Sequence, residues 1–116
     1  MKILHVTIRT DKFEEELSFY QDIAGLQIVR DMRPMGRNMV FLAHIPGDTE
    51  IEIIEAPGAV YAGNENLSVG FQTEDVNAKR QELIEMGMEP SPIISPNPQV
   101  HFFFVNDPAG VMVQFM

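Results

Sequence analysis

Two stretches of this sequence follow the same plan at a nearly constant spacing. Residues 5–11 and a helical stretch closed by Gly25 are matched by residues 68–74 and a helical stretch closed by Gly87. The two halves also end alike, since residues 49–53 are matched by residues 111–115. Ser68 follows His5 by 63 residues, and Gln114 follows Glu52 by 62. A fixed offset between matched elements indicates two copies of one supersecondary unit.

The length and composition limit what the chain can be. A chain of 116 residues is expected to form a single domain over 1–116, with module one at 1–56, a linker at 57–66 and module two at 67–116. It has no cysteine, which excludes disulfides, thiol nucleophiles and cysteine-ligated metals. The polar N-terminus argues against a signal peptide or a membrane span, and we expect a cytoplasmic protein.

The charge balance bears on the partners. The net charge is −9, from 17 acidic and 8 basic residues. Because phosphate binding needs a basic surface, nucleic acid is not an expected partner. The long-range field favours a cationic ligand, although acidity alone also confers solubility.

Apolar periodicity predicts the same element order in each half: strand, helix, then three strands. Asp11, with Glu14 as its capping-box partner, and Asp75 are the expected helix N-caps. In the first half the strands are expected at 2–9, 27–33, 38–45 and 49–55, and the helix at 12–24. In the second half the strands are expected at 67–72, within 88–94, at 100–105 and at 111–116, the helix at 76–86, and a stiff loop at 95–98.

Strand alternation sorts the side chains onto two faces. The apolar strand residues are expected under the helices: Leu4, Val6, Ile8, Ile51, Ile53, Leu67, Val69, Phe71, Val111, Val113 and Phe115. Val76, Leu83 and Met86 of the second helix are expected to face them. The opposite face carries His5, Glu50, Glu52 and Gln114, together with Ser68 and Met112 as candidate ligand contacts. Two such modules would enclose a cup, and a cleft of that kind is a natural ligand site.

These motifs together resemble the vicinal oxygen chelate superfamily, which includes glyoxalase I, extradiol dioxygenases and bleomycin-resistance proteins. The resemblance covers essentially the whole chain. It rests on residues 5–8, 18–20 with 25–26, 51–53, and 107–110 before 113–115. It implies an α+β, glyoxalase-like fold in which two βαβββ modules form a cupped mixed sheet, usually in a homodimer.

The resemblance also implies a divalent metal in the cup, which would be nickel, zinc, manganese or iron. His5 and Glu52 match the first two ligand positions, and Gln114 falls where many members have a glutamate. Ser68 falls where many members have a third-ligand histidine. Because a glutamine carbonyl is a weaker ligand and a serine hydroxyl a poor one, the second half lacks two strong donors.

Further positions are candidate ligand contacts. Arg9 lies where glyoxalase I members grip a carboxylate of glutathione, although Ala56 replaces their asparagine. His101 and Phe103 share a predicted strand, where His101 would serve as an acid or base and Phe103 would stack on a flat ligand. Glu52 and Glu50 are the candidate catalytic bases.

Three functions stay open at this point. The first is a small-molecule-binding protein of the glyoxalase and bleomycin-resistance type, with a degenerate metal site and a cationic or aromatic ligand. The second is a metal-dependent lyase or isomerase resembling glyoxalase I, in which an ion polarises vicinal oxygens. The third is a non-catalytic dimeric interaction domain. The residues Ser68 and Gln114 favour the first.

Overall fold

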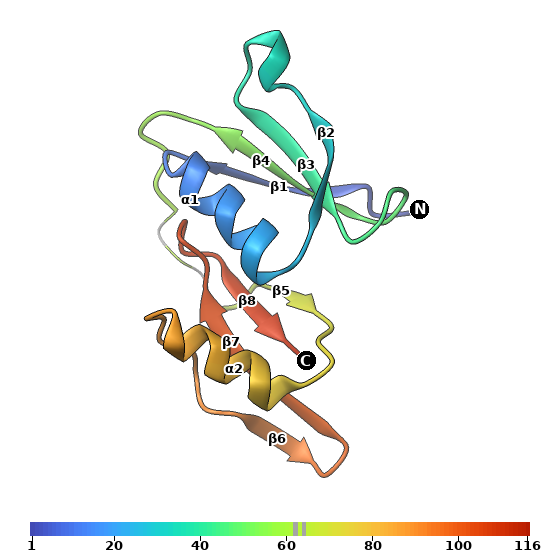
Figure 1. Cartoon of the computed structure of the whole chain (residues 1–116), viewed down its shortest axis with the longest axis vertical. Helices are drawn as coiled ribbons and strands as arrows, with labels where there is room; N and C mark the ends of the chain where they lie inside the picture. Colours follow the sequence, from blue (N-terminus) through green and yellow to red (C-terminus); the bar gives the residue numbers. More distant parts are fainter. Residues whose placement is uncertain (62, 64) are drawn as a thin grey trace. The chain divides into compact units, whose positions relative to one another are not determined.

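The computed structural model (Figure 1) describes residues 1–61, 63 and 65–116. The chain divides into two compact units, Met1–Tyr61 (unit 1) and Ala62–Met116 (unit 2), with the boundary inside residues 57–66. In the described part of the chain, no helix has both the length and the apolar character needed to cross a membrane.

Unit 1 is a four-stranded mixed sheet with one helical segment. Its strands are β1 (His5–Thr10), β2 (Gln27–Asp31), β3 (Met39–Ala43) and β4 (Glu50–Glu55), in the order β1-β4-β3-β2. The helical segment is α1 (Phe13–Ser18), continued by a π-helical turn over Phe19–Ile23, and a short 3-10 turn spans Arg33–Met35. Strands β1 and β4 are parallel, whereas β3 is antiparallel to both β2 and β4.

Unit 2 repeats this topology. Strands β5 (Ser68–Phe71), β6 (Ile94–Asn97), β7 (Val100–Asn106) and β8 (Met112–Phe115) are ordered β5-β8-β7-β6, and α2 spans Val76–Glu85. Strands β5 and β8 are parallel, as β1 and β4 are, and β7 is antiparallel to both β6 and β8. The predicted α+β class and the two βαβββ modules are confirmed by this repeated order.

Each unit buries its apolar residues between its helix and one face of its own sheet. In unit 1, α1 packs on β4; Phe13 and Leu17 of α1 and Tyr20 of the following π-helical turn are buried. In unit 2, α2 packs on β7, and Leu83 is its buried residue. Phe115 stacks between Phe71 and Phe103 at ring-centroid distances of 6.0 and 5.5 Å.

Helix ends were predicted with mixed success. The Asp75 side chain accepts a hydrogen bond from the Ala78 N–H, as an N-cap should, and Gly25 and Gly87 adopt the positive φ expected at helix C-termini. The capping box at Asp11 and Glu14 is wrong. The N-cap of α1 is Lys12, which makes no side-chain cap bond; the Lys12 N–H donates instead to the Thr10 hydroxyl.

Three further expectations are corrected. The strand expected within 88–94 and the loop expected at 95–98 are replaced by β6, which occupies Ile94–Asn97. Met86 was expected under α2 but is exposed, because it is the C-cap residue beyond the last helical turn. Leu4, Val6 and Leu67 were expected under the helices but are exposed. Leu4 and Leu67 precede the strands to which they were assigned, and Val6 lies in the edge strand β1.

Candidate functional site

The polar face of unit 1 is the face of its sheet that carries His5, Thr7, Glu50 and Glu52. Parallel pairing of β1 with β4 sets His5 beside Glu50 and Thr7 beside Glu52. Pairing of β4 with β3 adds Phe41 next to Glu52. Ile8, Ile51 and Ile53 alternate with these residues and belong to the core. The period of two therefore gathers the predicted polar residues of the first module on one face.

Glu52 is the most enclosed charged group on this face. The residue is only 9% exposed. Its Oε1 accepts a hydrogen bond from the Thr7 hydroxyl at 2.5 Å and lies 3.7 Å from Nε2 of His5. A buried carboxylate needs partners of this kind because losing water is costly to a charge. The structure thus brings together His5 and Glu52, which the sequence singled out, and adds Thr7.

A second cluster on the polar face includes an arginine that the sequence reasoning missed. Nη2 of Arg30 donates to Oε1 of Glu50 at 2.7 Å, and its guanidinium lies 3.8 Å from the ring centroid of Phe41. The His5 ring meets the same Phe41 ring edge-on at 6.0 Å. Arg30 therefore offsets the charge of Glu50 and leaves Glu52 as the stronger candidate base of the two.

Arg30 could not be placed from the sequence because β2 is irregular. The pairing of β2 with β3 shifts register between Ile28 and Arg30. A shift of this kind changes which face a side chain occupies, so alternation along β2 cannot place Arg30.

Arg9, a predicted ligand contact, lies two residues beyond Thr7 on β1, beside Ile54, and is exposed.

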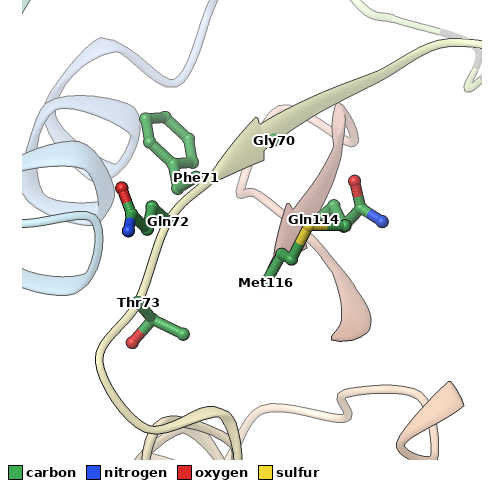
Figure 2. Close-up of a pocket in the computed structure, with 6 residues that line it drawn as sticks. All are labelled: Gly70, Phe71, Gln72, Thr73, Gln114 and Met116. Carbon is green, nitrogen blue, oxygen red and sulfur yellow. The ribbon is translucent and has the colours of Figure 1, made fainter. Parts of the chain in front are cut away.

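In unit 2 the equivalent face is uncharged. Pairing of β5 with β8 sets Ser68 beside Met112 and Gly70 beside Gln114, which corresponds to the row of Thr7 and Glu52 in unit 1. A pocket of about 500 Å³ opens at the end of these two strands (Figure 2). It is lined by Gly70, Phe71, Gln72, Thr73, Gln114 and Met116. The predicted residue Gln114 thus lies in the wall of this pocket.

Two other predicted contacts lie away from this pocket. The His101 ring is held in the β6–β7 hairpin, with Nδ1 at 2.7 Å from the Ser95 hydroxyl and Nε2 at 3.0 Å from the Pro98 carbonyl oxygen. Phe103 is fully buried, and its ring stacks on Phe115 in the core of unit 2. A ring enclosed in this way offers no surface to a ligand, because β7 pairing turns Phe103 to the side of Phe115 and Val113.

The comparisons with known proteins agree with the repeated topology. The family model of the Glyoxalase/Bleomycin resistance protein/Dioxygenase superfamily matches residues 2–115. The chain therefore belongs to this superfamily. No curated protein sequence matches it significantly.

Several solved structures share the fold at low sequence identity. The trypanothione-dependent glyoxalase I of Leishmania major is 23% identical, with a TM-score of 0.78 over 100% of this chain and 86% of that one. The lactoylglutathione lyase of Agrobacterium tumefaciens is 17% identical, with a TM-score of 0.70 over 97% and 90% of the two chains. The fosfomycin resistance protein FosX of Mesorhizobium loti is 16% identical, with a TM-score of 0.72 over 96% and 86%.

The divalent metal site predicted from the sequence comprises His5, Glu52 and Gln114. Unit 1 supplies two strong donors at adjacent positions, the His5 imidazole and the Glu52 carboxylate. Within residues 1–61, 63 and 65–116, no group of three or more histidine, cysteine, aspartate or glutamate side chains is arranged to hold an ion. Catalytic zinc sites typically use three protein ligands. The strong donors alone thus fall short of such a centre.

Proposed function

We propose that the protein binds a small organic molecule and that Glu52 and His5 make polar contacts with it. The observation that carries this proposal is the position of Glu52, a nearly buried carboxylate on the face of the sheet that is not the core. Keeping a charge there costs stability, and polar groups retained at such a cost are typical of functional sites.

The neighbours of Glu52 indicate which ligand it suits. Arg30 compensates the charge of Glu50, so Glu52 is the carboxylate of this row without a cationic arginine or lysine bonded to it among the described residues. The Phe41 ring beside it is buried and is covered by Arg30 and His5. A cationic or hydrogen-bond-donating group matches Glu52, and the net charge of −9 favours its approach.

The test is a ligand panel measured by thermal shift and calorimetry. Aromatic amines, their neutral analogues and their carboxylate analogues would be titrated into the wild type, Glu52→Gln and Glu89→Gln. We expect amines to stabilise the wild type, and Glu52→Gln to weaken their binding at least tenfold. Glu89→Gln removes the same charge from an exposed residue and should change affinity less than twofold. If no compound binds, or both variants behave alike, the proposal is wrong.

A second candidate is a divalent-metal-dependent lyase or isomerase of the glyoxalase type, favoured by the 3.7 Å approach of His5 to Glu52. Bound at these two residues, an ion of nickel, zinc, manganese or iron would supply Lewis-acid polarisation of vicinal oxygens. Metal-stripped protein should be titrated with each ion, alongside His5→Ala and Glu52→Ala. Micromolar binding that both substitutions abolish would favour this candidate; binding indifferent to both would refute it.

We also propose that the chain forms a homodimer. Strand β1 is an edge strand of the unit 1 sheet, and Val6 within it is exposed, as are Ile3 and Leu4 just before it. An apolar sheet edge left in water invites pairing with another chain. Light scattering after size-exclusion chromatography should give twice the mass of one chain, and Val6→Lys should shift the protein toward the monomer. A wild-type monomer at micromolar concentration would contradict the dimer.

A further inference from the structure

The pocket of unit 2 is bounded by two backbone segments that are hydrogen-bonded to each other. The Thr73 N–H donates to the Met116 carbonyl at 2.7 Å, and the Met116 N–H donates to the Phe71 carbonyl at 2.9 Å. Figure 2 shows Gln114 and Met116 coming from the end of β8, and residues 70–73 coming from the end of β5. Because these bonds continue the parallel ladder beyond both strands, the pocket wall is a preformed part of the fold.

The pocket differs from the matching place in unit 1 at one row of the sheet. In unit 1 the Thr7 side chain stands beside Glu52 and bonds to it. In unit 2 the same row holds Gly70 beside Gln114. A Cβ atom added to Gly70 would lie 3.3 Å from Oε1 of Gln114, which is closer than an ordinary contact. Gly70 does not adopt a positive φ, so its backbone does not require glycine. The absence of a side chain is what leaves space next to Gln114.

None of the six side chains that line the pocket carries a charge, and Phe71 and Met116 contribute apolar surface. Within the described residues the Gln114 amide makes no hydrogen bond, so one donor group and one acceptor remain for a guest. The volume of about 500 Å³ lies within the range of about 300 to 1,000 Å³ that is usual for small-molecule sites.

We propose that Gly70 keeps this pocket open for an uncharged, largely apolar ligand, with Gln114 as its hydrogen-bonding contact. The proposal goes beyond the proposed function, because every residue it uses lies in unit 2. An anionic group would lose its water here without gaining a countercharge from these side chains, whereas an aromatic ring would gain apolar contact with Phe71 and Met116.

The test uses two fluorescent probes with one skeleton. N-phenyl-1-naphthylamine is uncharged, and 8-anilinonaphthalene-1-sulfonate adds one sulfonate to it. We expect the uncharged probe to bind at least tenfold more tightly than the sulfonate. Gly70→Thr, which gives unit 2 the side chain found in unit 1, should weaken the uncharged probe at least tenfold. Amide resonances of residues 70–73 and 114–116 should shift on titration.

The controls separate a blocked pocket from a damaged fold. Asn106→Thr introduces the same side chain at an exposed residue of β7 outside the pocket lining, and should change binding less than twofold. Gln114→Glu keeps the size of the side chain but adds a charge, and should also weaken the uncharged probe tenfold. If circular dichroism shows that Gly70→Thr does not fold, the affinity of Gln114→Glu for the uncharged probe tests the proposal instead.

The outcomes distinguish this proposal from the broader one. If the uncharged probe binds but neither Gly70→Thr nor Gln114→Glu weakens it, or if the sulfonate binds equally well, Gly70 has no such role. Amine binding that depends on Glu52 would survive that result and keep the proposed function. Failure of every probe and every panel compound would refute both.

Discussion

The hydroxyl of Thr7 donates a hydrogen bond to the Glu52 carboxylate across the parallel β1–β4 pair. This bond fixes Oε1 of a residue that is nearly buried and has His5 as its other close polar neighbour. The orientation of the Glu52 carboxylate is therefore set by β1, the first strand of the repeat. Unit 2 has no counterpart of the bond, because Gly70 stands in place of Thr7.

Thr7→Val should lower the free energy of unfolding by about 1.5 kcal/mol, since it leaves Oε1 of Glu52 without its hydroxyl donor at nearly constant side-chain volume. Urea denaturation would measure the loss. A double-mutant cycle with Glu52→Gln isolates the pair, and a coupling energy below about 0.5 kcal/mol would show that the bond contributes little in solution.

Arg30 offers a second measurable interaction, with Phe41 under its guanidinium and Glu50 at its end. Arg30→Lys keeps the charge but loses the planar group that stacks on the ring. Because the arginine is half exposed, we expect a loss of only about 0.5 to 1 kcal/mol in unfolding free energy. Arg30→Lys in a Phe41→Leu background should cost clearly less. An equal cost in both backgrounds would mean that the stack is not stabilising.

Asp31 should titrate well below an ordinary aspartate. Hydrogen bonds from the side chain and then the backbone of Arg33 lower the pKa of Asp31 from 3.8 to about 2. Since the folded-state pKa is below the unfolded one, this contribution to stability is present above pH 4 and is lost as the pH falls toward 2. Carbon-13 NMR of the Asp31 carboxyl would follow it. Arg33→Gln should return the titration toward 3.8, and a wild-type midpoint already near 3.8 would contradict the pairing.

The repeat made most of the fold predictable, because each half signals the same strand and helix order. The faces of β1 and β4 followed from strict alternation, which is why His5 and Glu52 were found. Alternation failed where backbone geometry decides. The bulge in β2 concealed Arg30. Phe103, one of three consecutive phenylalanines in β7, was predicted to stack on a ligand, but its pairing turns it to Phe115 and buries it.

The prolines around Ser95 gave a different kind of error. Pro96 predicted a loop, yet Ile94–Asn97 forms β6. This strand lies at the edge of its sheet, where a residue without an N–H is tolerated because one side of the strand needs no ladder bonds. Edge position is a property of the assembled sheet, and a local sequence pattern does not reveal it.

The packing of α2 on the sheet of unit 2 depends on a single well-buried residue. Leu83 of α2 is completely enclosed, whereas its neighbour Ile84 is exposed. Leu83→Ala should reduce the free energy of unfolding by about 3 kcal/mol, because it removes buried methyl groups and leaves a cavity. Ile84→Ala, a matched truncation one position along, should cost less than about 1 kcal/mol. Urea denaturation gives both values, and hydrogen exchange should show α2 amides losing protection in Leu83→Ala alone. Similar losses in the two variants would mean that α2 is not anchored to its sheet through Leu83.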